Sequence, residues 1–437
     1  MSASFEDAPF GAFHRRLATY SCGGPFCDGY ILGIIAIALG PLSKEIGLST
    51  AAQGLIGAST LVGMFIGGGV FGFLTDLVGR RAMYTLDLLL FVFASAAQFW
   101  VHGFWSLFAL RFVLGIAIGA DYPIASALMV EFAPKKKRGM LLAAMVCAWW
   151  VGYSASFVIG YILSSSEEYS WRWMLASSAV PAALISILRW GTPESPRWLV
   201  AKGRFREAQH VVHSCFGESY EVEDSQPIKT EYRRIFQAPY SARVAFICLF
   251  WSCQIIPTFG IYTFAPALLR ALGAPNPVLG TAIISLFFVA GVIPAALLVD
   301  RWGRRPLLTT PFAVTGLALI ALAALPPGSH ALITACFIVF AMFNAGSSVL
   351  QWIYPSELFP TDVRATALGF ATAVSRIGAA AGTFLVPLAL ERFGVSNLML
   401  TFAVCCGLGW LAAWKYAPET SGLSLAQASS ISAPADL

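Results

Sequence analysis

The chain has 437 residues, of which 57% are hydrophobic and only 12% are charged, whereas an average soluble domain is about 25% charged. So much apolar surface excludes a soluble enzyme and a disordered chain. The net charge of +5 is spread along the chain without a basic stripe, so no nucleic-acid partner is expected. The composition predicts a protein whose main surroundings are the lipid bilayer.

Apolar runs recur along the whole sequence, each of about 20 residues, which is the length that crosses a hydrocarbon core of roughly 30 Å. Because lipid leaves no partner for free backbone groups, each run is expected to be a helix. The runs predict an all-α membrane protein with twelve transmembrane helices. They span residues 18–41, 53–75, 83–101, 105–131, 140–163, 172–190, 243–269, 277–299, 307–325, 331–354, 365–390 and 396–416.

The distribution of Lys and Arg predicts the orientation. Most of the 28 basic residues fall before the first run or in the even-numbered connections, and the opposite connections hold only Lys44, Arg172, Arg270 and Arg392. By the positive-inside rule both termini are cytoplasmic. We therefore expect an N-terminal six-helix bundle (1–190), a cytoplasmic linker (191–242), a C-terminal six-helix bundle (243–417) and a cytoplasmic tail (418–437).

Three short patterns recur about 225 residues apart, each at the end of an equivalent predicted helix. They are Asp-x-x-Gly-Arg-Arg at 76–81 and 300–305, Glu-x6-Arg at 131–138 and 357–364, and Pro-Glu at 193–194 and 418–419. The chain is therefore interpreted as an internal duplication, with two pseudo-repeated bundles.

These repeated charges lie where helices end on the cytoplasmic side. Acids facing guanidinium groups can hold the two halves together there, and they must separate when that side opens. The alternative is that the arginines only anchor helix ends to anionic lipid. The predicted gating network comprises Asp76, Arg80, Arg81, Glu131, Arg138, Glu194, Arg197, Asp300, Arg304, Arg305, Glu357, Arg364 and Glu419.

A few charges fall inside the predicted membrane spans, where an ion costs at least ~2.5–3.5 kcal/mol and should face a partner or a wet cavity. Asp28, Asp121 and Arg376 lie near the midplane and Arg111 in the outer half. No His occupies such a position, so Asp28 and Asp121 are the candidates for proton coupling. The alternatives are a substrate hydrogen-bond acceptor or a fixed structural charge. Asp87, nearer the cytoplasm, is expected to pair with a loop arginine.

Polar side chains at helical spacing predict where a substrate binds. The run 331–354 carries a polar stripe that begins at Asn344, and the run 243–269 carries one that begins at Gln254. Amide and aromatic groups suit a small polar ligand with a ring or a carboxylate, although packing alone also explains any single aromatic. The substrate-binding candidates are Arg111, Trp149, Gln254, Thr258, Tyr262, Asn344, Ser348, Gln351, Trp352 and Arg376.

The loop 72–81, the pattern Arg111-x-x-x-Gly115-x-x-x-Gly119 and the segment Pro193-Glu-Ser-Pro-Arg197 together resemble the major facilitator superfamily and its sugar-porter branch. Segments 119–123 and 350–361 are similar to its bacterial metabolite transport members, of the metabolite:proton symporter type. The resemblance implies alternating access, with helices 1, 4, 7 and 10 lining the path. The run 243–269 lacks the double Gln and the Asn of true sugar porters, so the substrate class stays open.

The predicted function is a secondary active transporter in the inner membrane of a bacterium. It moves a small polar metabolite, sugar-like or carboxylated, in proton-coupled uptake. An uncoupled facilitator, an exporter and a non-transporting sensor are the alternatives. An enzyme or an ATP-driven pump is not expected, because 191–242 has no phosphate-cradling loop and no nucleophile with its base. No metal or cofactor is expected, and the chain is expected to be monomeric.

Overall fold

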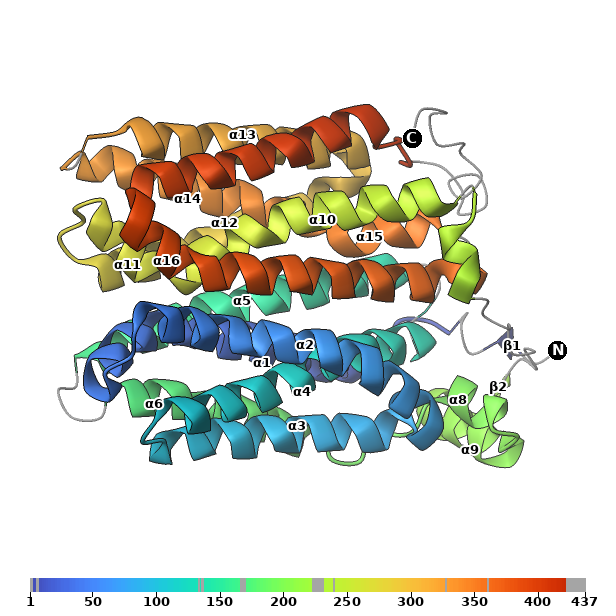
Figure 1. Cartoon of the computed structure of the whole chain (residues 1–437). Helices are drawn as coiled ribbons and strands as arrows, with labels where there is room; N and C mark the ends of the chain where they lie inside the picture. Colours follow the sequence, from blue (N-terminus) through green and yellow to red (C-terminus); the bar gives the residue numbers. More distant parts are fainter. Residues whose placement is uncertain are drawn as a thin grey trace.

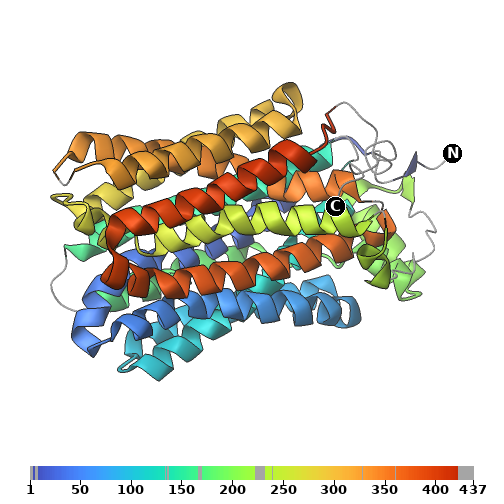
Figure 2. The ribbon, with the colours of Figure 1, turned by 45° about the horizontal axis from the view of Figure 1, so that its top comes forward.

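The computed structural model describes residues 3–4, 8–132, 134, 137–165, 170–221, 232–238, 240–326, 328–359 and 361–421. Almost all of this is α-helix, and the long helices run side by side in one direction or its reverse (Figures 1 and 2). A helix pairs every backbone group internally, which is what a lipid environment requires. The predicted all-α class is therefore confirmed.

The helices of the predicted first half occupy the lower part of Figure 1. They are α1 (Ala12–Ile46), α2 (Thr50–Val78), α3 (Arg80–Ala97) with the 3₁₀ turn Gln98–Trp100, α4 (Phe104–Phe132), α5 (Arg138–Ser164), α6 (Ser170–Ser177) and α7 (Ala179–Leu188). The predicted run 172–190 is thus two short helices, α6 and α7.

The helices of the predicted second half occupy the upper part of Figure 1. They are α10 (Tyr240–Thr263), α11 (Ala265–Ala271), α12 (Pro277–Trp302), α13 (Arg304–Ala324), α14 (His330–Ser347), α15 (Leu350–Leu358) and α16 (Thr361–Tyr416). The 56 residues of α16 would measure far more than a bilayer at about 1.5 Å per residue. The helix is broken at Gly394, where φ is 75°. Its two arms correspond to the predicted runs 365–390 and 396–416.

Small elements gather at the end of the molecule where both chain ends lie (Figure 1). They are α8 (Pro196–Ala201), α9 (Phe205–Phe216), the 3₁₀ helix Tyr232–Phe236, and the strands β1 (Ala3–Ser4) and β2 (Tyr220–Glu221), which pair in parallel. The segment after the sixth predicted helix is thus placed beside the N-terminus.

The outer surface is apolar, as lipid contact requires. Eleven described helices are long and apolar enough to cross a membrane. Large side chains such as Trp105 (76% exposed), Leu297 (74%) and Ile187 (70%) have no protein covering them. A soluble protein rarely exposes apolar surface on this scale.

Glycines bring helices within each half into backbone contact. A Cβ on Gly115 would collide with the backbone of Thr60, and one on Gly119 with that of Met64. Gly115 and Gly119, one turn apart on α4, therefore pack closely against α2. In the same way Gly152 of α5 packs on the backbone of Phe26 in α1.

The two halves touch through α2 with α16 and through α5 with α12. Gly54, near the start of α2, packs on the backbone of Phe384, near the kink of α16. The hydroxyls of Ser154 and Ser285 lie 3.3 Å apart. The α2–α16 contact lies at the end of the bundle opposite the chain termini.

Candidate functional site

A cavity with about 760 Å³ of empty space, part of it open to solvent, lies between the two halves. Its walls come from α1, α4 and α5 of the first half and from α10, α14, α15 and α16 of the second. Eight of the ten predicted substrate-binding residues line it: Trp149, Gln254, Thr258, Asn344, Ser348, Gln351, Trp352 and Arg376. The polar stripes of two distant helices thus meet at one site.

The other two predicted residues do not line this cavity. Arg111 is 1% exposed, and its Nη2 donates to the carbonyl of Ile31 over 3.3 Å. Tyr262 packs its ring against Phe288, with the ring centroids 4.5 Å apart. Burial inside the helix packing describes these two side chains better than ligand binding does.

The amides at the cavity wall bind one another. Gln254 Nε2 donates to Ser347 Oγ over 2.6 Å and to the carbonyl of Asn344 over 3.1 Å. Its Oε1 accepts from Gln351 Nε2 over 2.6 Å. The side chain of Asn344 accepts from Thr258 over 3.0 Å. This network joins α10, α14 and α15 and fixes the rotamers around the cavity.

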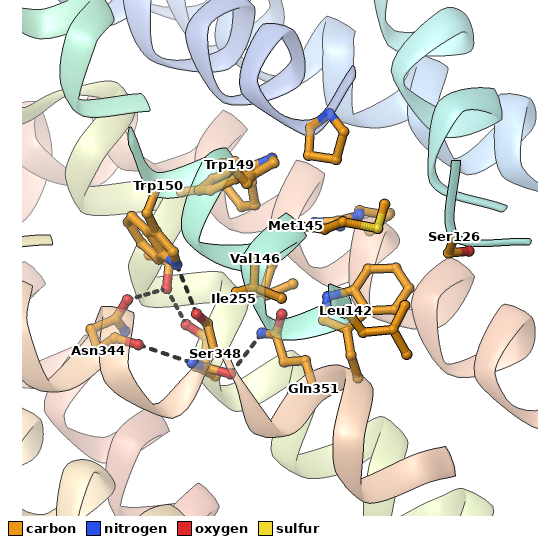
Figure 3. Close-up of a pocket in the computed structure, with 16 residues that line it drawn as sticks. Ser126, Leu142, Met145, Val146, Trp149, Trp150, Ile255, Asn344, Ser348 and Gln351 are labelled. Carbon is orange, nitrogen blue, oxygen red and sulfur yellow. Dashed lines mark hydrogen bonds between the residues drawn. The ribbon is translucent and has the colours of Figure 1, made fainter. Parts of the chain in front are cut away.

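Aromatic side chains from both halves complete the wall (Figure 3). Trp150 Nε1 donates across the interface to Ser348 Oγ over 2.7 Å. Trp149 stacks on Tyr153 with centroids 5.0 Å apart and meets Phe259 edge-on at 6.3 Å. Figure 3 shows Trp150, Asn344 and Ser348 on one side of the cavity and the apolar Leu142 and Met145 on the other.

Arg376 is the charged residue of the cavity wall. It lies on α16 and is 4% exposed, and its guanidinium lies 5.7 Å from the ring centroid of Phe259. A cation at this depth attracts anions strongly, because little water screens its charge.

A cluster of buried carboxyl groups occupies the first half beside this cavity. Asp28 of α1 and Asp121 of α4 are fully buried, and Asp87 of α3 is 1% exposed. In the described part of the chain none of their oxygens accepts a hydrogen bond from a donor. The carboxyl of Asp121 lies directly against Gly24 of α1, where any side chain would collide with it.

The expected pairing of Asp87 with a loop arginine is wrong. Within the described residues its carboxyl oxygens have no hydrogen-bond partner, and its charged neighbour is Asp121 of α4, which packs against α3. Two carboxyl groups that share a site repel each other unless one carries a proton.

The cation that sequence reasoning missed here is Arg189, which is 6% exposed. Its guanidinium donates to the carbonyl of Tyr20 over 2.6 Å and 3.0 Å, and its charge acts on Asp28, as does that of Arg376. Arg189 lies inside the predicted run 172–190, and a charge inside a predicted span was the signal that could have identified it.

The Pro-Glu repeats cap helices that are distant in the sequence. Glu194 accepts the backbone N–H groups of Arg80 (3.0 Å) and Arg81 (3.2 Å) at the start of α3. Glu419 accepts those of Arg304 (2.9 Å) and Arg305 (3.0 Å) at the start of α13. Each carboxylate thus lies at the positive end of a helix dipole.

The glycines of the Asp-x-x-Gly-Arg-Arg repeats make this capping possible. Gly79 has φ 111° and Gly303 has φ 86°, a region that favours glycine. A Cβ on Gly79 would lie 2.5 Å from Glu194 Oε2, and one on Gly303 2.6 Å from Glu419 Oε2. Both backbone conformation and space therefore require glycine.

Glu419 lies outside the membrane spans. Burial disfavours its charged form, but the backbone N–H groups of Arg304, Ser421, Arg305 and Thr420 outweigh that effect and lower its pKa. The carboxylate is therefore ionised at neutral pH.

Ion pairs join further members of each predicted network. Arg80 Nη2 lies 3.5 Å from Glu131 Oε1, and Arg304 Nη2 lies 2.7 Å from Glu357 Oε1. These contacts join helices of one half, not the two halves. Arg197 is half-buried in α8. The side chains of Asp76, Arg138, Asp300 and Arg364 lie outside the described residues.

A family model described as sugar (and other) transporter matches residues 10–431. Two relatives from Escherichia coli (strain K12) are named as metabolite transport proteins. YaaU is 41% identical over 98% of both chains. The inner membrane protein YgcS is 37% identical over 98% of this chain and 96% of its own.

Among solved structures, the xylose transporter XylE from E. coli in a partially occluded inward open conformation has a TM-score of 0.81 and 21% identity, over 95% of this chain and 100% of its own. Another XylE structure, described as a major facilitator superfamily proton:xylose symporter, has a TM-score of 0.75 and 22% identity, over 95% of this chain and 98% of its own. At this identity the likeness shows the fold. The family match over nearly the whole chain and the two relatives YaaU and YgcS establish that the chain belongs to the sugar (and other) transporter family of membrane proteins.

Proposed function

We propose that the protein takes up a small polar metabolite, sugar-like or an organic carboxylate, by alternating access, and couples this uptake to protons. One observation carries the proposal. The cavity lined by both halves contains the buried Arg376, and Pro25 of its wall adjoins Gly24, against which the carboxyl of Asp121 lies. Substrate and proton would therefore bind at neighbouring sites near the midplane, as coupling requires.

Asp28 and Asp121 are the proposed proton carriers, with Asp87 sharing a proton with Asp121. Three buried carboxylates beside Arg189 would leave uncompensated charge in the membrane. Each such charge costs at least ~2.5–3.5 kcal/mol. Binding protons removes this cost, and opening of the site to water on the cytoplasmic side would let them leave. The description of XylE as a proton:xylose symporter supports this part of the proposal.

Alternating access would use the contacts between the halves. Gly54 of α2 and Phe384 of α16 meet at the end opposite the chain termini, while the ion pairs Arg80–Glu131 and Arg304–Glu357 each lie within one half. Rocking of one half against the other would separate α2 from α16 at that end. It would bring the two charge networks at the other end together as a gate.

This proposal places both termini in the cytoplasm and twelve crossings in two bundles, 1–190 and 243–417, joined by the linker 191–242 and followed by the tail 418–437. The name of the relative YgcS supports the inner membrane as the location. One chain supplies the whole cavity wall, so a monomer would suffice.

The membrane potential supplies enough free energy to drive proton-coupled accumulation. A membrane potential of 100 mV contributes about 2.3 kcal/mol for each charge moved, which corresponds to roughly fifty-fold accumulation. The same fold also permits an uncoupled facilitator, an exporter or a sensor without turnover. These alternatives differ in whether a proton gradient drives accumulation and in whether binding is accompanied by flux.

The test is uptake by the purified protein in liposomes, with radiolabelled sugars, polyols and small carboxylates, with and without an inward proton gradient. Accumulation of one compound only with the gradient supports proton-coupled uptake. Equilibration that ignores the gradient supports a facilitator. Saturable binding without flux of any bound compound supports a sensor and contradicts the proposal.

A further inference from the structure

The described part of the cavity wall carries positive charge and no negative charge. Among the described residues that line it, Arg376 is the charged one, and the others are apolar, aromatic, amide or hydroxyl side chains. Carboxylates on the wall would repel an anion, but the described wall has none. The buried carboxyl groups of Asp28 and Asp121 do not line this wall. The forked donors of a guanidinium match the two oxygens of a carboxylate, so an anionic group on the ligand suits this wall.

Aromatic surface lies directly beside that cation. Arg376 lies over the ring of Phe259, and Phe259 in turn meets Trp149. The indole Nε1 of Trp149 is buried and, within the described part of the chain, has no acceptor. The wall therefore offers a flat apolar surface, a cation at its edge and one unused N–H donor.

The amides of the wall are largely committed to one another. Both the donor and the acceptor of Gln254 are in use, and the carbonyl oxygen of Asn344 accepts from Thr258. A sugar presents several hydroxyl groups, and each needs a partner when it leaves water. A polyol needs several partners from a wall whose amides already bind one another, whereas a ligand with one polar group needs few.

We infer that the ligand of this cavity is a small organic monocarboxylate with a flat apolar body, its carboxylate at Arg376 and its ring against Trp149 and Phe259. This inference rests on the proposed function and chooses the carboxylate over the sugar. The wall favours a single negative charge, because a second carboxylate would lie among apolar side chains such as Leu142, Met145 and Ile255 without a cation.

Ligand pairs that differ in one property test the inference on the wild-type protein. The purified full chain in detergent is titrated with benzoate, benzamide, cyclohexanecarboxylate, phthalate and D-glucose, and binding is followed by tryptophan fluorescence and by thermal protection. Benzoate is expected to bind at least about tenfold more tightly than its neutral amide, since a charge-assisted pair contributes about 1.5–3 kcal/mol. Cyclohexanecarboxylate and phthalate are expected to bind more weakly than benzoate.

Variants on one helix then identify the cation. Arg376→Gln is expected to weaken benzoate binding by about 10- to 100-fold and to remove the preference over benzamide. Arg376→Lys is expected to retain the preference in part, because the charge stays but the paired donors do not. Arg392→Gln, an exposed arginine of the same α16, is the matched control and is expected to bind like the wild type.

Several results would overturn the inference. Equal binding of benzoate and benzamide, tighter binding of D-glucose than of benzoate, or no binding of any carboxylate in the panel each contradicts it. So does an Arg376→Gln protein that folds and keeps the preference. Because these are binding measurements, they fail independently of the proposed function. A carboxylate that binds at Arg376 but is never carried into liposomes would leave the inference standing and reject transport.

Discussion

The two halves of this protein share the glutamate caps at one end of the bundle and differ in what they bury in the membrane. Each half caps one helix with a glutamate from a distant Pro-Glu segment, Glu194 in the first half and Glu419 in the second. Among the described residues inside the membrane, the first half has carboxyl groups without donors, whereas the second has amides that bind one another beside Arg376. The two halves therefore share the parts that hold helices in place and differ in their polar chemistry.

This difference suggests a division of labour that substitutions can break. If the first half holds protons, replacing its carboxyls should uncouple transport without removing substrate. If the second half holds substrate, disturbing its amides should weaken binding whether or not a proton gradient is present. The two kinds of variant should therefore have different signatures in the same liposome assay.

The largest expected effect is loss of accumulation in Asp121→Asn. An amide keeps the shape of the side chain but cannot carry the proton, so the roughly fifty-fold accumulation that 100 mV supports should fall to about one. Exchange of substrate across preloaded liposomes should persist. Asp28→Asn is the second candidate for the same phenotype. Accumulation that stays at the wild-type level in both variants would contradict a proton role for the first half.

The comparison becomes sharper with Gln254→Ala in the second half. This change removes the hydrogen bonds of Gln254 with Ser347 and Gln351, and truncating one partner of a buried hydrogen bond costs about 1–3 kcal/mol. Thermal unfolding should shift to lower temperature, and exchange and gradient-driven uptake should decrease together. Gln237→Ala, at an exposed glutamine beyond the 3₁₀ helix Tyr232–Phe236, is the matched control. Loss of accumulation with normal exchange in Gln254→Ala would contradict the assignment of substrate binding to this half.

A third substitution tests the feature that the halves share. Gly303→Ala forces a side chain into a left-handed backbone conformation and against Glu419, and Gly203→Ala does the first without the second, because nothing lies near its Cβ position. Backbone strain of this kind costs about 1–3 kcal/mol. The Tm should fall in both variants, and further for Gly303→Ala. Equal decreases would mean that the carboxylate contact contributes nothing.

Much of the fold follows from the sequence, because lipid permits few solutions. The apolar runs predicted the helices, and the repeated motifs predicted where equivalent helices end. The site was predicted in part. Polar stripes on two helices identified the amides, but no spacing on one helix reveals that Arg111 and Tyr262 turn away from the cavity.

The errors at the site share a physical cause. Asp87 was expected beside a loop arginine because that pairing is local, whereas its neighbour Asp121 comes from the packing of α3 on α4. Arg189 was missed for the same reason, since its contact with the Tyr20 carbonyl joins segments 169 residues apart. Contacts between helices depend on rotation about the helix axes, and a single sequence does not encode that rotation in any local pattern.

The smallest expected effect concerns the pH dependence of the shared cap. The pKa of Glu419 is lowered in the folded state, so its stabilisation is present above the ordinary carboxyl pKa of 4.5 and is lost as the pH falls through the lowered value. At neutral pH, Glu419→Gln should therefore lower stability by about 0.3–1 kcal/mol, as expected for a charge at a helix N-terminus. The Tm difference between wild type and variant should shrink below pH 4.5. Glu194→Gln, the equivalent change in the first half, should reduce the Tm in the same direction. A difference for Glu419→Gln that grows on acidification would show that the carboxylate is not what stabilises the start of α13.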